Sequence, residues 1–283
     1  MRIAVLSGKG GTGKTTITSN FAVSIKNSIS IDSDVEEPNL HIFMDMKTPI
    51  SEPVYTLYPS IDKELCNLCG KCGDFCNYNA IIPAKNQVVV FSESCHDCGG
   101  CKLVCPTGAI TYKKREVGKI FKGKTKYDTE LYYGILNIGE MSGVKIINQL
   151  KKYSELDEKT IFIDSPPGTS CATVAAVEDV DYAIIVSEPT PFGVSDMKMV
   201  VEMLTEMKIP FGLIINKAGL GDNEIYDYCK DEDIEILGEI PFNKKIAKLY
   251  ADGKIFSDSL PEYKNFFNDI YKHITEKRSL LWI

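Results

Sequence analysis

The sequence predicts a doubly wound, mostly parallel α/β sheet that is interrupted by a small inserted α+β domain. Short apolar runs alternate with longer amphipathic segments along most of the chain, and eight of the ten cysteines lie between Cys66 and Cys105. Such alternation is typical of a parallel sheet with helices on both faces and ligands at the carboxyl ends of its strands. The 283 residues, 44% hydrophobic and 25% charged, suffice for a large core and exclude disorder, collagen and coiled coil.

The expected elements follow the chain in order. Strands are expected at 2–6, 28–31, 160–163, 182–186, 211–215 and 234–237, and helices near 15–26, 141–153, 193–207, 223–230, 243–252 and 262–276. We assign residues 1–57 and 113–283 to the two parts of the α/β domain and residues 58–112 to the insert. A basic, hairpin-like stretch is expected after the insert, to about residue 136.

Hydropathy and charge limit the kinds of partner that the sequence predicts. No apolar run approaches the ~18 residues of a membrane span, and no signal-peptide core precedes Gly8, which predicts a cytoplasmic protein. The net charge is −7, although residues 113–126 carry a local charge of +6. Because the rest of the chain is strongly acidic, neither nucleic acid nor a membrane is expected as a partner.

A glycine-rich loop connects the first predicted strand to the first predicted helix. It matches G-x-x-x-x-G-K-[ST] with the residues Gly8, Lys9, Gly10, Gly11, Thr12, Gly13, Lys14 and Thr15. In such a loop, backbone N–H groups surround phosphate oxygens at a helix N-terminus. Lys14 is expected to reach the β- and γ-phosphates of ATP and Thr15 to hold Mg²⁺, and Thr16 completes the predicted binding set.

A dinucleotide site is the alternative for this loop. Gly8, Gly10 and Gly13 also fit the dinucleotide fingerprint, with Asp32 and Asp34 about 20 residues further on. The Lys14–Thr15 pair has no use in a dinucleotide site. Asp164 also follows a second apolar strand, which is where a nucleoside-triphosphate site has the carboxylate that helps to hold magnesium. We therefore favour a nucleoside triphosphate over a dinucleotide.

The cysteine window contains one complete spacing twice. Cys66, Cys69, Cys72 and Cys76 follow C-x-x-C-x-x-C-x-x-x-C, and Cys95, Cys98, Cys101 and Cys105 repeat it. This is the bacterial-ferredoxin spacing, in which the fourth cysteine of each run serves the other cluster. The predicted ligand sets are Cys66, Cys69, Cys72 and Cys105 for one [4Fe–4S] cluster, and Cys95, Cys98, Cys101 and Cys76 for the other.

Zinc is the alternative for the cysteines. Four-cysteine zinc sites usually contain two C-x-x-C pairs separated by a longer spacer, unlike three cysteines in succession followed by a fourth. The duplicated run therefore favours a bacterial-ferredoxin-like insert. The first run departs from the ferredoxin pattern at Asn77, where proline is usual, which affects the loop more than the ligands.

Several motifs together resemble the MinD/ParA/Mrp group of P-loop ATPases, which includes the nitrogenase iron protein. They are Lys9, the turn 32–34 and the segment 164–168, and the resemblance covers 1–57 and 130–283. The whole chain resembles the members of this group that contain an inserted ferredoxin domain. The resemblance implies a P-loop NTPase fold and an ATP-dependent homodimer.

The same resemblance implies roles for individual residues. Lys9 would reach the partner subunit's phosphates, Asp34 would position the attacking water, and Asp164 would hold Mg²⁺ through water. Gly168 would sense the γ-phosphate through its backbone N–H. Asn216 and Pro241 occupy positions that resemble the two base-contacting segments of the group.

The parts together predict an ATPase that couples nucleotide state to two [4Fe–4S] clusters and gates electron transfer to an unidentified redox partner protein. The alternative is an iron–sulfur cluster carrier or assembly ATPase of Mrp type, although no C-x-x-C pair follows Cys105. A spatial organiser like ParA would need a contact with DNA or a membrane. For Cys171, at the start of an expected helix, we favour a buried apolar thiol over an iron ligand shared across a dimer axis.

Overall fold

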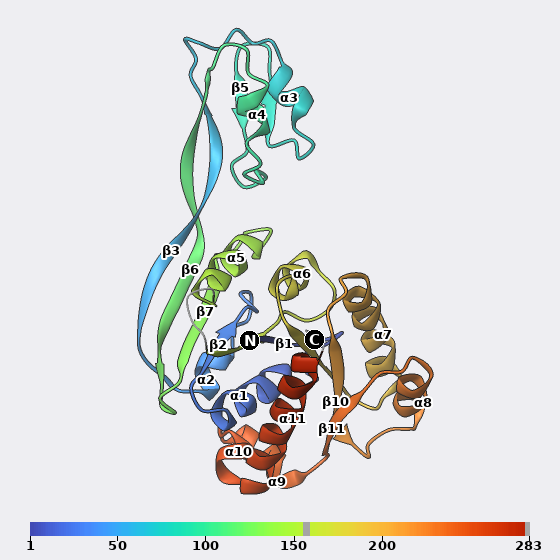
Figure 1. Ribbon diagram of the computed structural model, residues 1–283. Coiled ribbons are helices and arrows are strands. Elements are labelled where there is room, and N and C mark those ends of the chain that lie inside the picture. The colour runs from blue at the N-terminus through green and yellow to red at the C-terminus, as the bar shows by residue number, and fades with distance from the viewer. Residues whose placement is uncertain (155–158, 281–283) are drawn as a thin grey trace.

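The computed structural model describes residues 1–154 and 159–280. Within them, a nine-stranded sheet forms the centre of a large lobe, and a small cysteine-rich lobe projects from it (Figure 1). In spatial order the strands are β11 (Ile236–Pro241), β10 (Phe211–Ala218), β9 (Tyr182–Ser187), β1 (Arg2–Leu6), β8 (Thr160–Asp164), β2 (Ser28–Asp32), β7 (Glu130–Leu136), β6 (Ile110–Thr125) and β3 (Met46–Ile61).

Most of the sheet is parallel. The strands from β11 to β7 run parallel to their neighbours, whereas β6 is antiparallel to both β7 and β3. All six strands predicted from apolar runs lie in the parallel part, and the last of them begins at Ile236 rather than 234. The prediction of a mostly parallel α/β fold is confirmed.

The basic segment after the cysteines forms β6 and β7. These strands pair as a hairpin, but β7 also pairs in parallel with β2, so the hairpin is part of the main sheet. Its partner β3 was not predicted, because Pro49 and Pro53 interrupt its apolar pattern. Proline lacks a backbone donor and is tolerated on an edge strand, which is where β3 lies.

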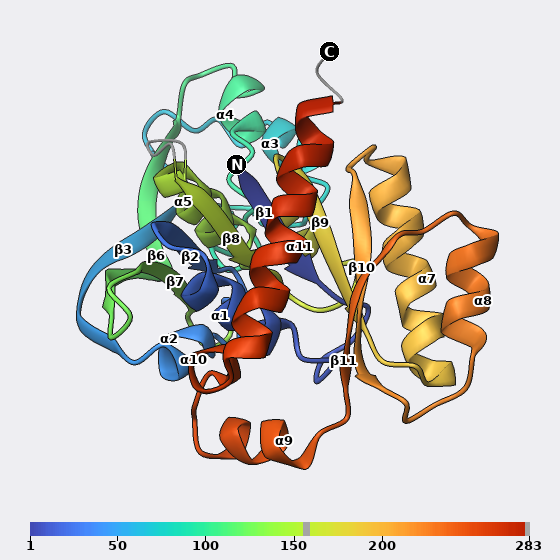
Figure 2. The ribbon, with the colours of Figure 1, turned by 60° about the horizontal axis from the view of Figure 1, so that its bottom comes forward.

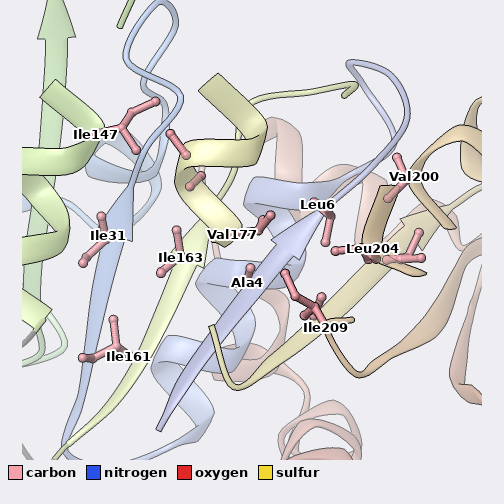
Figure 3. Close-up of a cluster of buried hydrophobic side chains, with 14 of the residues drawn as sticks. Ala4, Leu6, Ile31, Ile147, Ile161, Ile163, Val177, Val200, Leu204 and Ile209 are labelled. Carbon is pink, nitrogen blue, oxygen red and sulfur yellow. The ribbon is translucent and has the colours of Figure 1, made fainter. Parts of the chain in front are cut away.

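Helices cover both faces of the sheet. The α5 (Val144–Ser154), α6 (Cys171–Val177), α7 (Pro191–Glu206) and α8 (Glu224–Asp231) helices pack on one face, and α1 (Lys14–Ser24), α10 (Phe256–Ser259) and α11 (Pro261–Leu280) on the other. Side chains of β1 alternate between the two cores: Ala4 and Leu6 belong to the first (Figure 3), and Ile3 and Val5 to the second. Figure 2 shows α11 lying over the second face. No helix in the described ranges is long and apolar enough to cross a membrane.

Aromatic side chains hold α11 and α1 against the sheet. The Phe21 ring on α1 lies 5.3 Å from that of Phe162 on β8 and 4.8 Å from that of Phe267 on α11, between ring centroids. All three side chains are fully buried. Because the loop before α1 carries the glycine motif, this contact also fixes where that loop lies.

A long antiparallel ribbon, formed by β3 and β6, leaves the edge of the sheet. It pairs from Met46 with Thr125 to Ile61 with Ile110, and its far end carries residues 62–109, which we call the cysteine lobe (Figure 1). Within this lobe lie α3 (Lys71–Phe75), the antiparallel pair β4 (Ile81–Pro83) and β5 (Val88–Val90), and α4 (Gly100–Leu103).

The cysteine lobe consists of two halves that repeat with an offset of 29 residues, as between Cys66 and Cys95. The backbone N–H of Asp62 donates to the carbonyl of Ala109, and the equivalent N–H of Phe91 donates to that of Ala80, both at 2.8 Å. Each half therefore pairs with the end of the other half. The two short helices also begin alike, after Gly70 and Gly99 in the left-handed region.

Removing the buried ring of Phe267 should destabilise the fold. We expect Phe267→Ala to lower the free energy of unfolding by about 3–5 kcal/mol, because it leaves a cavity between α1, α10 and α11. Urea titration followed by circular dichroism measures the change. The control is Phe192→Ala, whose ring is 78% exposed and whose loss should cost less than about 0.5 kcal/mol. Equal effects of the two variants would contradict this packing.

Candidate functional site

The glycine-rich loop ends at the open N-terminus of α1. Gly11 and Gly13 have φ values of 81° and 101°, in the left-handed region that glycine adopts without strain. No side chain caps the first turn of α1. Its backbone N–H groups and the positive end of the helix dipole are therefore available to an anion.

Two glycines of the loop are required by close approach of other elements. A Cβ on Gly8 would lie 2.1 Å from the Asp196 carbonyl oxygen on α7, and one on Gly13 would lie 2.5 Å from Nδ2 of Asn216. The same Nδ2 atom donates a 2.8 Å hydrogen bond to the Thr12 carbonyl. Asn216 at the end of β10 thus clamps the loop, a role that its sequence position alone does not indicate.

Asp164 is buried directly behind the loop. The Thr15 hydroxyl donates to its Oδ2 at 2.6 Å, and the Thr18 hydroxyl approaches its Oδ1 at 3.3 Å. Burial raises the pKa of Asp164 to about 6, although these hydroxyls and the Lys14 ammonium favour the ionised carboxylate. A carboxylate and a hydroxyl held together beside a phosphate loop form a donor pair suited to Mg²⁺.

Asp32, the last residue of β2, and Asp34, just beyond it, make different contacts. Asp32 is fully buried and accepts the backbone N–H groups of Asn39 and Leu40, both at 2.9 Å, at the start of α2 (Leu40–Phe43). Burial and the neighbouring Asp164 raise the pKa of Asp32 well above its ordinary value. Asp34 is half-buried beside Lys14, and burial raises its pKa while the lysine lowers it. Asp34 therefore faces the open site, and Asp32 supports the turn.

A cavity of about 660 Å³ opens above the loop. Nine of the predicted nucleotide-site residues line it: Gly10, Gly11, Gly13, Lys14, Thr15, Thr16, Asp34, Asn216 and Pro241. Five predicted residues do not line it: Gly8, Lys9, Thr12, Asp164 and Gly168.

These residues lie outside the lining of the cavity for different reasons. Asp164 lies behind Thr15, and Gly8 faces α7. The backbone N–H of Gly168 donates to the Ser7 carbonyl at 2.9 Å, so a contact of this N–H with a phosphate requires that bond to open. Lys9 is half-buried, and its ammonium has no hydrogen-bond or ion-pair partner in the ranges described.

Sequence patterns missed most of the apolar wall of this cavity. It consists of Ile42, Phe43, Phe242, Ile246 and Tyr250, and the rings of Phe43 and Tyr250 lie 5.0 Å apart between centroids. These side chains come from α2, the end of β11 and α9 (Lys244–Ala251), which are distant in sequence. Two local signals pointed to parts of it: Phe242 follows Pro241 in a segment that resembles a base-contacting one, and Ile246 and Tyr250 lie four residues apart on a predicted helix. Such a wall suits a flat apolar group such as a nucleotide base.

The eight cysteines of the lobe face two cavities in two sets of four. One small cavity is lined by Cys66, Cys69, Cys72 and Cys105, and a second, of about 240 Å³, by Cys76, Cys95, Cys98 and Cys101. These are the two ligand sets expected from the sequence, including the exchange of Cys76 and Cys105 between the halves. Ile81, Cys101 and Ile110 form a buried core between them.

The thiols of the second set influence one another. Burial raises the pKa of Cys95, and the neighbouring Cys101, Cys98 and Cys76 raise it further, whereas Arg115 lowers it. Thiolates brought this close are stabilised by a bound metal centre. No three Cys, His, Asp or Glu side chains in residues 1–154 and 159–280 are arranged around a single metal ion. An iron–sulfur cube divides its ligands among separate iron atoms, so the four-cysteine cavities remain compatible with it.

A groove of about 540 Å³ separates the cysteine lobe from the large lobe. Cys95 and His96 line it from one side, and α5 and Cys171 from the other. Asp97 forms an ion pair with Lys145 of α5 across it. The expectation that Cys171 is buried was wrong: it is the first residue of α6 and is exposed at this groove, whereas the remaining cysteine, Cys229, is buried.

Comparisons with known proteins agree with the nucleotide-binding fold. A family model described as the CobQ/CobB/MinD/ParA nucleotide binding domain matches residues 3–256. An uncharacterised protein of Methanocaldococcus jannaschii is 32% identical, over 98% of this chain and 96% of its own length. The iron–sulfur cluster carrier protein of the same organism is 24% identical, over 98% and 84%. The MinD septum site-determining protein of Pyrococcus horikoshii, solved with Mg-ADP, has the same fold (TM-score 0.58, 19% identity, 96% and 95% coverage).

Neutralising Asp164 should stabilise the metal- and nucleotide-free protein in a pH-dependent way. Folding raises the pKa of this carboxyl from 3.8 to about 6, so its ionisation costs stability as the pH rises through that window. We expect Asp164→Asn to increase the free energy of unfolding at pH 8 by roughly 3 kcal/mol and to have no effect below pH 3.8. Urea titrations between pH 3.5 and 8 measure the difference.

The control for this prediction is Asp269→Asn. Asp269 is exposed on α11, so its substitution should leave the pH dependence of unfolding unchanged. A gain in Asp164→Asn that stayed constant from pH 8 to pH 3.5 would show that the buried charge is not its cause.

Proposed function

The chain belongs to the CobQ/CobB/MinD/ParA family of nucleotide-binding proteins, and on that premise we propose that it is an ATPase whose nucleotide state is coupled to two [4Fe–4S] clusters. The observation that carries the proposal is the division of eight cysteines between two cavities on one arm of a nucleotide-binding fold. The proposed setting is the cytoplasm.

The nucleotide site contains the groups that are needed for the attack of water on a γ-phosphate. In the proposed mechanism the loop N–H groups and Lys14 hold the phosphates, and Thr15 and Asp164 hold Mg²⁺. Asp34, half-buried beside Lys14, orients the water for in-line attack. Asn216 and Pro241 border the base, with the apolar wall behind it.

A second copy of the chain completes this site in the proposal. The Lys9 ammonium, which lacks a partner within the described ranges, is directed to the phosphates bound by the partner subunit. Closure of two subunits over ATP would also release the Gly168 N–H from Ser7 and turn it to the γ-phosphate. The functional unit is therefore an ATP-dependent homodimer.

The cysteine lobe supplies the two cluster sites in the proposal. Cys66, Cys69, Cys72 and Cys105 hold one cluster and Cys95, Cys98, Cys101 and Cys76 the other; bound clusters would supply one-electron redox chemistry. Apolar side chains of the lobe surround the two cluster sites. Ile81 and Ile110, both 2% exposed, lie between the sites and exclude water from the shared core.

Contacts between the lobes provide a route for coupling. The loop after Asp164 leads into α6, and α6 packs on α5 through the Lys151 ammonium, which donates to the Ala175 carbonyl at 3.0 Å. Helix α5 in turn holds Asp97 of the cysteine lobe through Lys145. A rearrangement of the loop at the γ-phosphate would thus reach the second cluster site through packed helices.

Cluster delivery is the second candidate function. The similarity to an iron–sulfur cluster carrier protein favours delivery to a recipient protein, and it extends over 98% of the chain. Resident clusters are favoured by the four cysteines that each cavity provides, because a complete ligand set retains its cluster. The two candidates share the nucleotide site and differ in whether the clusters leave.

One experiment separates the two candidates. In anaerobic redox titrations of the reconstituted protein, we expect a non-hydrolysable ATP analogue to shift a cluster midpoint relative to ADP. Coupling is reciprocal, and a shift of about 59 mV corresponds to ~1.4 kcal/mol for one electron. The matched assay incubates the protein with ATP and an apo-protein acceptor. Unchanged midpoints together with ATP-dependent loss of iron to the acceptor would replace electron transfer with cluster delivery.

Lys14→Ala should separate the two sites. We expect the variant to lose nucleotide binding in calorimetry, because it removes the loop lysine that lines the cavity, while the iron content and the cluster absorbance stay at wild-type values. The control is Lys26→Ala, an exposed lysine beyond α1, which should bind nucleotide normally. Loss of cluster absorbance in Lys14→Ala would mean that the two lobes do not fold independently.

A further inference from the structure

The two halves of the cysteine lobe differ at a position that faces a buried cysteine. With the 29-residue offset, Cys72 corresponds to Cys101, and Pro83 corresponds to Tyr112. Tyr112 places its hydroxyl 3.4 Å from Sγ of Cys101. The backbone of both halves is alike, so this side chain makes the two repeated sites chemically different.

The hydroxyl of Tyr112 is placed to donate. A cysteine that ligates iron is a thiolate and carries no proton. The Tyr112 hydroxyl must therefore supply the proton of a hydrogen bond to the Cys101 sulfur. A phenol is protonated at neutral pH, so the Tyr112 hydroxyl has a proton to donate. Cys101 is 8% exposed and is the most buried cysteine of the lobe, so water does not compete for its sulfur.

The first half has no equivalent donor at this position. Pro83 has no hydroxyl and packs against the backbone beside Cys72, where a Cβ on Gly73 would lie 2.2 Å from its Cδ. The first set does have one hydroxyl contact, between Thr107 and Cys105 at 3.7 Å. That contact is longer and exposed, so water competes with it.

The charges beside the second set are paired with one another. Arg115 pairs with Glu140 and Lys145 with Asp97, and all four residues line the groove beside Cys95. A hydrogen bond to a ligating sulfur stabilises the more negative, reduced form of an iron–sulfur cluster, and so raises its reduction potential.

We propose that Tyr112 is a positioning residue that donates a hydrogen bond to Cys101 and makes the second cluster the first of the two to be reduced. This inference rests on the proposed function. One electron from a low-potential one-electron reductant, dithionite in the test below, would then reside on the cluster of Cys95, Cys98, Cys101 and Cys76, and no bond is made or broken. That cluster borders the groove facing Cys171 and α5, so the electron is held on the side of the lobe that faces the nucleotide domain.

The test compares two tyrosines of the same cavity. Tyr112→Phe and Tyr78→Phe each remove one hydroxyl, and the Tyr78 hydroxyl has no hydrogen-bond partner among the described residues. Both variants and the wild type are reduced stepwise with dithionite and followed by electron paramagnetic resonance. Cys98→Ser, which alters a ligand of the second set, assigns that cluster's signal.

We expect the second cluster's midpoint to move to a more negative potential in Tyr112→Phe, with the first cluster's midpoint unchanged and Tyr78→Phe like the wild type. Unchanged midpoints in Tyr112→Phe, or an equal shift in both variants, would overturn the proposal. If Tyr112→Phe loses its cluster, the hydrogen bond can still be tested on wild-type protein in deuterated buffer. Electron–nuclear double resonance must then detect an exchangeable proton at the first-reduced cluster, and its absence refutes the hydrogen bond.

Iron analysis separates this inference from the function on which it rests. Wild-type protein with about eight irons per chain satisfies the proposed function, whatever the effect of Tyr112. Reconstituted wild-type protein that binds no iron would contradict both the proposed function and the role of Tyr112. Eight irons with unaltered potentials in Tyr112→Phe would remove the role of Tyr112 alone.

Discussion

The burial of Asp164 is the constraint on which the nucleotide end of the molecule depends. Parallel pairing of β1, β8 and β2 brings the glycine loop, Asp164 and Asp32 to one edge of the sheet. A carboxylate that is 1% exposed is costly when ionised, and the Thr15 hydroxyl and the Lys14 ammonium only partly offset that cost. The edge is therefore poised for a divalent cation, and the loop, its clamp at Asn216 and the turn at Asp32 hold the surrounding groups where such a cation would sit.

The same strand end leads towards the cysteine lobe. Beyond Asp164 the chain enters α6, which packs on α5, and α5 carries the lysine that pairs with Asp97. These contacts join packed helices, and in the proposed function they carry a displacement at the phosphate edge to the cysteine lobe. The groove beside Cys95 is where α5 and the cysteine lobe face each other.

Local chemistry made much of this molecule predictable. The glycine loop and the cysteine runs are each contained in a few consecutive residues, because phosphate binding and cluster ligation demand fixed short spacings. Long-range contacts were not predictable in this way. The clamp at Asn216 depends on β10 ending beside the loop, the exposure of Cys171 depends on where α6 meets the groove, and β3 is stabilised by pairing with β6 despite Pro49 and Pro53.

The ribbon of β3 and β6 has a consequence for how such a molecule could arise. Asp62 and Ala109, at the two ends of the cysteine lobe, are joined by a backbone hydrogen bond. The lobe therefore enters and leaves the chain at the tip of a single hairpin, and a short turn could replace it without altering one strand of the sheet. Such a lobe could arise by insertion: a cysteine-rich module whose ends already lie together can be gained, lost or exchanged in one event, and the protein that receives it keeps its own architecture.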